Sequence, residues 1–343
     1  MRVAMYYKND DIRLEEMGKP ALLPGEILVK VKSSGICGSD VMEWYRIKKA
    51  PIVLGHELSG DIAEVGEGVK DFAVADRVVF THHVPCNNCR YCLEDKPAMC
   101  ETLRSTKFYP GGFSEYVRVP AINIEKGGVL KMPDSVSYEE GTFVEPVGCA
   151  VRGHRKANVS PGSSVLVLGS GLSGLIHIQL AKAFGAGRIV ATDVNDYRLE
   201  YALKMGADFS FNAMDENMID NLLAANDGRG YDFVIICTAV PVAFKQAMKA
   251  VDKGGTVLVY AINTPGTEMP FDIYDFYNRG ITLIATYAAS PRDLAEALRL
   301  IQHGRVETQK LITHRLPLKD TVEGFQLMVK GGESMKVIID PQA

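Results

Sequence analysis

The 343-residue sequence lacks any apolar run long enough to cross a bilayer. Its longest apolar stretches, such as Phe233–Cys237, have the length of a strand, whereas a membrane-spanning helix needs about 18–20 apolar residues. The opening stretch MRVAMYYKNDDIRLEE has no apolar signal core. The sequence therefore predicts a soluble, cytoplasmic protein with no membrane partner.

An excess of charge of either sign is also missing. Lys and Arg number 38 against 42 Asp and Glu, which gives a net charge of −4 with no long block of one sign. Proteins that neutralise a phosphate backbone usually carry a basic excess, so no nucleic-acid partner is expected. Hydrophobic residues make up 47% of the chain, too many for a disordered protein. The length suits two domains of about 100–200 residues each.

The seven cysteines are few and odd in number, which argues against a secreted disulfide framework. Four of them form a C-x2-C-x2-C-x7-C pattern at Cys86, Cys89, Cys92 and Cys100. Four thiolates at short spacing can surround one zinc ion and leave no open position, so this site would be structural. An iron–sulfur cluster uses the same ligands. A nucleic-acid-binding zinc ribbon would need two C-x2-C pairs about 15–20 residues apart, which the pattern lacks.

The first half of the chain reads as short strands separated by glycine-rich turns. Strands are expected at 27–31, 78–80 and 116–119. This pattern is typical of a compact, β-rich domain with irregular loops.

From about residue 150, apolar strands alternate with helices. Expected strands are 165–168, 189–192, 233–236 and 256–260, and expected helices are 175–184, 198–205 and 242–251. Strands that are apolar on both faces indicate a parallel sheet covered on both sides. A helix at 292–303 and a strand at 336–339 follow. The fold class is therefore α/β with a doubly wound domain.

A glycine motif opens the first helix of this second domain. The segment Gly169-Ser-Gly171-Leu172-Ser173-Gly174 is G-x-G-x-x-G, and it directly follows an apolar strand. Gly169 permits a tight turn, Gly171 lets a pyrophosphate approach the backbone, and Gly174 lets the helix pack closely on the strand. Free N–H groups at the helix start would bind the phosphates. A glycine-rich turn of some other doubly wound protein is the alternative.

An acidic residue at the end of the next strand refines the cofactor prediction. Asp193 stands 22 residues after Gly171, where a carboxylate accepts hydrogen bonds from ribose hydroxyls and repels a 2′-phosphate. It therefore favours NAD over NADP. Arg198 keeps NADP open, because a nearby arginine can bind a phosphate. Thr238, just after the strand at 233–236, completes the expected cofactor-binding set.

The first half of the chain also contains a cysteine, a histidine and two glutamates that could bind a second metal ion. Cys37 lies in Gly35-Ile-Cys-Gly-Ser-Asp40, His56-Glu57 follows Gly55, and Glu145 precedes Pro146. Each is ordinary alone, and no spacing rule joins them. Sulfur, imidazole and carboxylate together suit a catalytic zinc with one position open.

Taken together, these motifs resemble those of the zinc-containing medium-chain alcohol dehydrogenases, over essentially the whole chain. Within that family, Glu145 and the segment from Thr192 to Leu199 resemble the polyol branch, which includes sorbitol, threonine and galactitol-phosphate dehydrogenases. The resemblance implies a GroES-like catalytic domain at 1–148 and 288–343 and a Rossmann domain at 149–287. It also implies one structural and one catalytic zinc, NAD, and a homo-oligomer, a tetramer rather than a dimer.

The resemblance further implies the site's chemistry. Zinc would be held by Cys37 and His56 with Glu57 or Glu145, and a hydride would pass from a secondary alcohol to the nicotinamide. Ser39 would take the alcohol proton, although its hydroxyl could equally cap a helix that starts there. Many relatives carry a histidine five residues after the zinc cysteine, where this chain has Met42.

Several residues are expected to have lesser roles. His82 and His83 are expected on the surface, and Cys149 and Cys237 are expected to be buried packing residues. Arg46, Lys48 and Lys49 suggest either a solvated basic loop or a contact to an acidic substrate.

Two other functions compete with a zinc-dependent dehydrogenase. A zinc-free reductase of the same superfamily would lack the ligand set at Cys37, His56, Glu57 and Glu145. A non-catalytic protein that senses nucleotides or metals would keep the glycine loop and the cysteine cluster but would not need that set.

Overall fold

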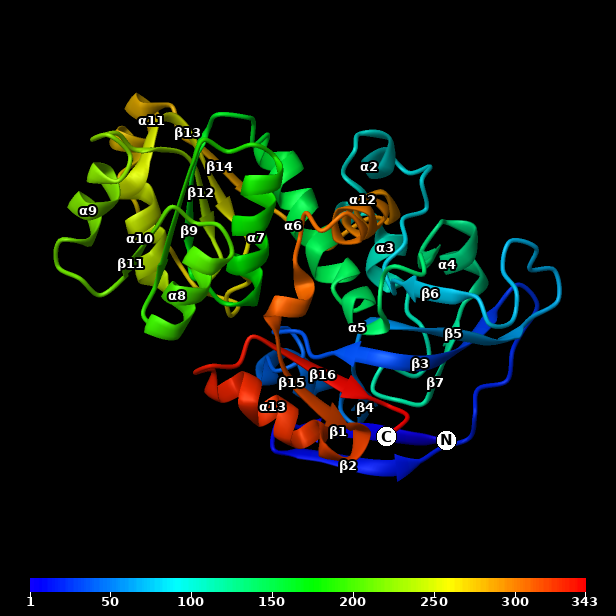
Figure 1. Cartoon of the computed structure of the whole chain (residues 1–343). Coiled ribbons are helices and arrows are strands. Elements are labelled where there is room, and N and C mark those ends of the chain that lie inside the picture. The colour runs from blue at the N-terminus through cyan, green and yellow to red at the C-terminus, as the bar shows by residue number, and fades with distance from the viewer. The chain divides into compact units, whose positions relative to one another are not determined.

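The computed structural model describes all residues from 1 to 343 (Figure 1). The chain divides into two compact units. The first unit contains Met1–Gly148 and Ala288–Ala343, and the second contains Cys149–Tyr287. Helix α6 (Val144–Ala157) begins in the first unit and ends in the second.

The first unit is built around a seven-stranded sheet in the order β15-β16-β3-β5-β6-β8, with β7 also paired to β3. Its strands are β3 (Ile27–Gly35), β5 (Glu57–Val65), β6 (Arg77–Phe80), β7 (Tyr116–Val119), β8 (Val129–Lys131), β15 (Ile312–Pro317) and β16 (Lys336–Asp340). A three-stranded sheet joins β1 (Arg2–Lys8), β2 (Asp11–Glu16) and β4 (Ile52–Val53). The carboxyl-terminal segment therefore pairs with strands from the start of the chain.

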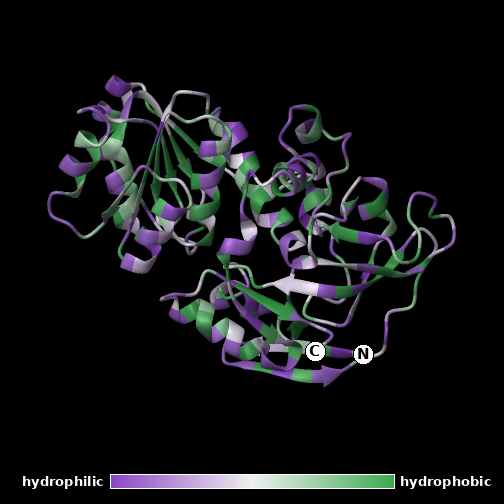
Figure 2. Ribbon diagram, viewed as in Figure 1, coloured by the Kyte–Doolittle hydropathy of each residue, from purple (hydrophilic) through white to green (hydrophobic).

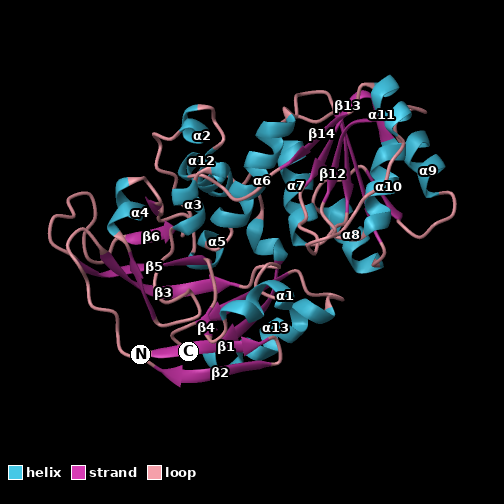
Figure 3. Cartoon of the chain, turned by 180° about the vertical axis from the view of Figure 1, so that it is seen from behind, coloured by secondary structure: helices cyan, strands magenta, loops and turns pink.

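Short helices connect these strands (Figure 3). They are α1 (Glu43–Arg46), α2 (Arg90–Leu93), α3 (Glu101–Ser105), α4 (Ala121–Glu125), α5 (Tyr138–Gly141), α12 (Pro291–Gln302) and α13 (Thr321–Lys330), with 3-10 turns at Ile47–Lys49, Pro97–Met99, Thr308–Leu311 and Leu318–Asp320. The predicted helix at 292–303 corresponds to α12, which Ser290 caps and Pro291 starts. Proline is favoured there because its missing N–H would have no partner in the first turn.

The second unit is a parallel six-stranded sheet in the order β11-β10-β9-β12-β13-β14. Its strands are β9 (Ser164–Leu168), β10 (Arg188–Asp193), β11 (Phe209–Asn212), β12 (Tyr231–Ile236), β13 (Val251–Val259) and β14 (Thr282–Ala285). Numbered from β9, this is the 3-2-1-4-5-6 order of a dinucleotide-binding fold. The predicted fold class, a GroES-like β-rich domain with a doubly wound Rossmann domain, is confirmed.

Helices cover both faces of the parallel sheet (Figure 3). They are α7 (Leu172–Ala183), α8 (Asp196–Lys204), α9 (Met218–Ala224), α10 (Pro241–Ala250) and α11 (Ile273–Arg279). The strands of the sheet are mostly hydrophobic (Figure 2), and all five residues of β9 are buried. Helix α7 begins three residues earlier than predicted, because Gly171 already serves as its N-cap. None of the chain's helices combines the length and apolar composition that crossing a membrane requires.

Two histidines lie in the core of the second unit. His154 and His177 are 1% and 0% exposed, and their rings stack with centroids 5.0 Å apart. None of their four ring nitrogens has a hydrogen-bond partner. Burial lowers the pKa of His154 to about 3, and burial followed by the charge of His154 lowers the pKa of His177 well below its usual value. Both rings are therefore neutral in the folded state at pH 7.

This pair predicts that the second unit loses stability in acid. The unfolded chain takes up protons on both histidines below about pH 6.5, and the folded chain does not, so stability falls as the pH drops from about 6.5 towards 3. Each histidine contributes about 1.4 kcal/mol per pH unit in this window. We expect His154→Leu to reduce the slope by about half, measured by hydrogen exchange of β9 and β12 between pH 7 and 5. The exposed His303→Leu is the control. Equal slopes in both variants would contradict the prediction.

Candidate metal centre and dinucleotide site

The strand register of the first unit brings Cys37 and His56 together. Strands β3 and β5 are antiparallel, with Gly35 opposite Glu57. Cys37 lies two residues beyond the end of β3, and His56 lies one residue before β5 begins. Because the strands run in opposite directions, the end of β3 and the start of β5 lie at the same end of the strand pair, and so do these two residues. Residues that are 19 positions apart in the sequence therefore face one site.

Three potential metal ligands lie close together at this end of β3 and β5. The ligand atoms of Cys37, His56 and Glu57 all lie within 4.8 Å of one another. Cys37 and His56 are half-buried, and Glu57 is buried. The family resemblance implied Cys37 and His56 with either Glu57 or Glu145, and the structure brings Cys37, His56 and Glu57 together.

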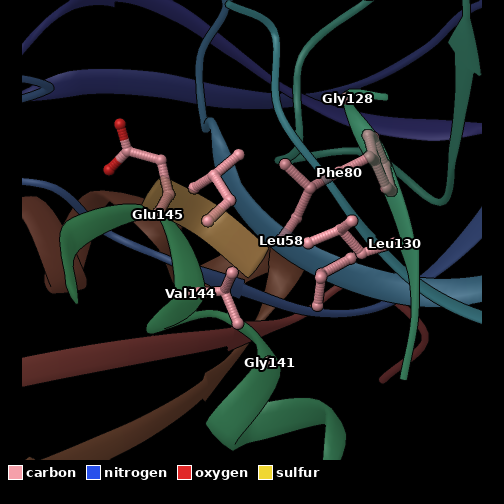
Figure 4. Close-up of a pocket in the computed structure, with 9 residues that line it drawn as sticks. Leu58, Phe80, Gly128, Leu130, Gly141, Val144 and Glu145 are labelled. Carbon is pink, nitrogen blue, oxygen red and sulfur yellow. The ribbon is translucent and has the colours of Figure 1, made fainter. Parts of the chain in front are cut away.

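Glu145 does not belong to this group of three. It lies in the first turn of α6 and lines a small, largely apolar cavity (Figure 4). In that view its carboxylate points away from Leu58 and Phe80. Of the two carboxylates considered from the sequence, Glu57 is therefore the one that the structure places with the cysteine and the histidine.

A buried carboxylate orients the histidine. Asp40 is 0% exposed, and its Oδ1 atom lies 3.3 Å from His56 Nδ1 and 3.2 Å from an Arg46 guanidinium nitrogen. Burial alone would raise the pKa of Asp40, but His56 and Arg46 outweigh it and lower that pKa. Burial likewise opposes a charge on His56, yet Asp40 and Cys37 raise the pKa of His56 well above its usual value. The Asp40 carboxylate and the His56 imidazole thus hold each other in place at the site.

These residues fit a zinc ion by their chemistry. Sulfur, imidazole nitrogen and carboxylate oxygen are the donors that zinc takes in catalytic sites with three protein ligands. The carboxylate of Asp40 against Nδ1 is the usual support for a histidine that binds metal through its other nitrogen. The N–H of Ser39 donates to Cys37 Sγ over 3.4 Å, while burial and the Glu57 carboxylate raise the pKa of that thiol.

Ser39 does not cap a helix, so that alternative is wrong. The first helix, α1, starts at Glu43, and its N-cap position is Met42, which makes no side-chain cap bond. The guanidinium of Arg46 instead donates to Ser39 Oγ over 2.9 Å and, through Nε, to the Ser39 carbonyl over 2.9 Å. These bonds fix the hydroxyl beside the metal ligands. Since Asp40 also neutralises Arg46, a role for Arg46 in binding an acidic substrate is not favoured.

The prediction that His82 and His83 lie on the surface is wrong. Both are only partly exposed, and the His82 ring packs edge-on against His56 at 5.2 Å and against Phe108 at 5.8 Å. His83 stacks on His82 at 3.7 Å, and its Nδ1 lies 2.7 Å from the Leu103 carbonyl. Burial lowers the pKa of both rings, to about 4 for His83. The position of these histidines could not be predicted from the sequence. It depends on β6, which ends two residues before His82 and directs both rings towards the interior.

The four clustered cysteines also form one site. Their sulfur atoms lie within 4.8 Å of one another, and three pairs measure 3.5, 3.6 and 3.9 Å. A tetrahedral zinc with sulfurs at about 2.3 Å requires sulfur–sulfur distances of about 3.8 Å. This spacing fits one ion and is too small for an iron–sulfur cluster, in which the sulfurs bind different irons. The members are Cys86, Cys89, Cys92 and Cys100.

Local structure prepares these sulfurs for a metal. The N–H of Cys89 donates to Cys86 Sγ over 3.3 Å, and the N–H of Cys86 donates to Cys100 Sγ over 3.4 Å. Burial and the neighbouring Cys89 sulfur raise the pKa of Cys92 to about 12. Four thiolates this close need a compensating cation, which a divalent metal supplies.

The other two cysteines lie outside both groups. Cys149 and Cys237, which were expected to be buried packing residues, are each partly exposed. Neither forms a disulfide.

In the second unit, the glycine motif forms the turn between β9 and α7. Gly169 has φ +92°, a conformation that side chains other than glycine rarely adopt. A Cβ on Gly174 would overlap the Gly169 carbonyl oxygen, and one on Gly171 would approach only the Arg198 guanidinium, at 3.9 Å. Leu172 and Ser173 then form the first turn of α7. The N–H groups of the first turn of α7 have no acceptor within the helix and can bind an anion.

Three more residues of the predicted cofactor set, Thr238, Asp193 and Arg198, lie beside this turn. Thr238 follows β12 and contacts Gly169, since a Cβ on Gly169 would lie 3.1 Å from that of Thr238. Asp193 ends β10 and accepts hydrogen bonds from three backbone N–H groups, those of Ser170, Val194 and Asn195. A carboxylate has about four acceptor positions, so one remains for a ribose hydroxyl. An Arg198 guanidinium nitrogen lies 4.0 Å from Asp193.

Known protein families match both units of the chain. The Alcohol dehydrogenase GroES-like domain matches residues 23–134, and the Zinc-binding dehydrogenase domain matches residues 174–303. The chain is 33% identical to a probable D-xylulose reductase A of Emericella nidulans, covering 96% of this chain and 93% of that one. It is 29% identical to the sorbitol dehydrogenase of Bacillus subtilis, covering 99% and 97%. The alcohol dehydrogenase TADH from Thermus sp. ATN1 superposes with a TM-score of 0.88 at 30% identity, covering 99% of each chain.

A dinucleotide-binding fold, a metal-ligand set and these matches define a metal-dependent dehydrogenase. More specifically, the chain belongs to the zinc-containing medium-chain alcohol dehydrogenases, in the branch of the polyol dehydrogenases. It transfers a hydride between a small-molecule alcohol and NAD, and it uses zinc.

Proposed function

We propose that the protein oxidises a secondary alcohol of the polyol type at a zinc ion held by Cys37, His56 and Glu57. The observation that carries this proposal is the convergence of these three ligand atoms within 4.8 Å. The names of the relatives, a sorbitol dehydrogenase and a D-xylulose reductase, support a polyol or its ketose as substrate. The ligand set argues against a zinc-free reductase or a protein that only senses nucleotides.

Each residue of the site has a proposed part in the reaction. Zinc, when bound, supplies positive charge that makes an alcohol more acidic. Cys37, His56 and Glu57 would hold that ion, and Glu145 would complete its shell through water. Ser39, fixed by Arg46, accepts the proton of the alcohol. Because Met42 cannot carry a proton, the onward path starts at Ser39 and continues through the cofactor ribose and water.

We further propose that the first unit is the catalytic domain and the second the dinucleotide-binding domain. Gly169, Gly171, Leu172, Ser173 and Gly174 hold the pyrophosphate at the start of α7. Thr238 borders this turn, and Asp193 and Arg198 contact the adenosine ribose. The cluster of four cysteines is the structural zinc site, with no open position for a substrate.

Metal analysis and a substrate panel test the function. We expect two zinc ions per chain and zinc-dependent NADH formation with one or more polyols among a panel of polyols, sugar phosphates, hydroxy amino acids and diols. A chelator that removes only one zinc should stop turnover while the fold persists. A single zinc per chain in the fully active protein would contradict the proposal.

The choice of cofactor predicts the effect of a substitution at Asp193. Asp193→Asn keeps one oxygen for the N–H groups of Val194 and Asn195 but removes the charge that repels a 2′-phosphate. We expect the preference for NAD over NADP, measured as the ratio of kcat/KM values, to fall by at least about tenfold. The matched control is Asp196→Asn, an exposed acid in the first turn of α8. A preference that stays unchanged would show that Asp193 does not contact the ribose.

We propose a homo-oligomer, with pairing through the sheet of the second unit and a tetramer as its final state. Edge strand β14 exposes Leu283, and helix α11 exposes Tyr274 and Tyr277 by 74% and 80%. An unpaired, partly apolar edge strand readily adds a strand from another copy. Sedimentation equilibrium should give four chains for the native protein and fewer for Leu283→Arg. A native monomer would contradict this.

We also propose a cytoplasmic location. Five cysteines in the two metal sites must stay reduced to bind zinc, as they do in a reducing compartment. Recovery of the protein outside the cytoplasm on fractionation of its native cells would overturn this.

A further inference from the structure

A lysine from the last strand lies against the metal-ligand set. Strand β16 pairs with β3, and the N–H of Ile36 donates to the Val337 carbonyl. This register puts Lys336, the first residue of β16, beside the end of β3 that leads to Cys37. The ammonium of Lys336 forms an ion pair with Glu57 Oε2. Two segments separated by 279 positions thus meet at one carboxylate.

This ion pair is sealed from water. The side chains of Lys336 and Glu57 are 0% and 1% exposed. Glu57 is the only hydrogen-bond partner of the ammonium, which otherwise lies 5.3 Å from the centre of the Phe143 ring. A charged amine without access to water is held by its one partner, because leaving it would cost the full desolvation penalty. The pair is therefore a fixed contact.

Gly35 makes room for the pair. A Cβ at this position would collide with the Lys336 side chain and come within 3.0 Å of Glu57 Oε2. The ammonium therefore lies over the bare backbone of β3, two residues before Cys37. No other lysine or arginine pairs with Glu57, since Arg46 is bound to Ser39 and Asp40.

We propose that Lys336 is a positioning residue that holds the Glu57 carboxylate partly away from the zinc ion. Lys336 thereby limits how strongly Glu57 binds the zinc. This inference rests on the metal site proposed above. One carboxylate faces two cations, the ammonium and the metal. While the ammonium keeps Oε2, Glu57 gives less of its charge to the metal. The ion then stays more electrophilic and keeps a position for the alcohol.

Substitution of Lys336 tests this proposal, because a positioning role and a purely structural role predict opposite changes in metal affinity. In Lys336→Met, Glu57 is free to bind the metal fully, and a positive charge close to the ion is gone. Both effects strengthen metal binding, so we expect the affinity of the Cys37 site to rise by at least about tenfold. A purely structural role for Lys336 predicts the reverse, because a disturbed site binds metal less tightly.

The measurements are chelator competition for cobalt in this site, with zinc kept in the four-cysteine site, and the visible spectrum of the bound cobalt. We expect tighter binding, a spectrum changed by the stronger carboxylate ligand, and a lower kcat with a smaller change in KM. Lys336→Met combined with Glu57→Gln should lose the gain in affinity. Lys131→Met, which breaks an exposed ion pair to Asp76 on the same sheet, is the matched control.

Unchanged or weaker cobalt binding in folded Lys336→Met would overturn the inference, as would a gain that persists in the double variant. If Lys336→Met does not fold, Lys336→Gln keeps a hydrogen-bond donor without the charge and must show the same sign. Failure of the proposed function looks different, because the native protein would then bind no cobalt at Cys37 at all.

Discussion

Cys37→Ala is expected to lower alcohol-dependent NADH formation by at least about a thousandfold, while NADH still binds. The substitution removes the one sulfur ligand of the proposed catalytic site, and the two ligands that remain, His56 and Glu57, cannot hold zinc firmly. Loss of outer-shell partners of a metal ligand already costs about 10–100-fold, so loss of a direct ligand should cost more. The glycine turn that binds the dinucleotide is in the second unit and is unaffected.

Three measurements on Cys37→Ala separate loss of the metal from loss of the fold. Zinc content should fall from two ions to one per chain, tryptophan fluorescence of Trp44 should show a folded first unit, and NADH affinity should stay within about twofold. Cys149→Ala is the matched control, since Cys149 is a partly exposed cysteine outside both metal groups. Turnover near the native rate in Cys37→Ala would disprove the proposed role of Cys37.

Local patterns explain why much of this molecule could be predicted from its sequence. The glycine motif, the apolar strand before it and the acid after the next strand all lie within one stretch of chain, so their spacing alone indicates a dinucleotide fold. The four cysteines span only 86–100, and the structure brings their sulfurs together. In both cases the interacting residues are close in sequence, and the backbone between them has few ways to fold.

The parts that could not be predicted depend on strand register across the first unit. Nothing in the segment 336–339 identifies Lys336 as the partner of Glu57, because the contact exists only once β16 lies beside β3. In the sequence, Arg46 is one of several basic residues in a loop. In the structure, the single turn of α1 positions its guanidinium to donate to Ser39 Oγ. His82 was expected on the surface, yet the end of β6 turns it towards His56. Glu145 and Glu57 were equivalent candidates until the register separated them.

Cys100→Ala is expected to have the largest effect on stability. Cys100 is the most deeply buried cysteine of the four-cysteine cluster, and without it three sulfurs remain for a tetrahedral ion. Binding of a structural zinc contributes directly to folding, and its loss is among the causes of destabilisation above about 4 kcal/mol. For a unit of this size, that corresponds to a fall in Tm of about 8–16 °C. Because Trp44 is the only tryptophan and lies in the first unit, its fluorescence follows that unit alone.

Comparing two cysteine variants shows that the two metal sites have separate roles. Cys100→Ala should lose one zinc and much of its stability but keep turnover at temperatures below its new transition. Cys37→Ala should lose the other zinc and its turnover but keep most of its stability. Cys237→Ala, the same substitution at a cysteine of neither site, controls for the loss of a thiol. If Cys100→Ala kept two zinc ions and the native Tm, the cluster would not bind metal, and the assignment of a structural zinc would have to be given up.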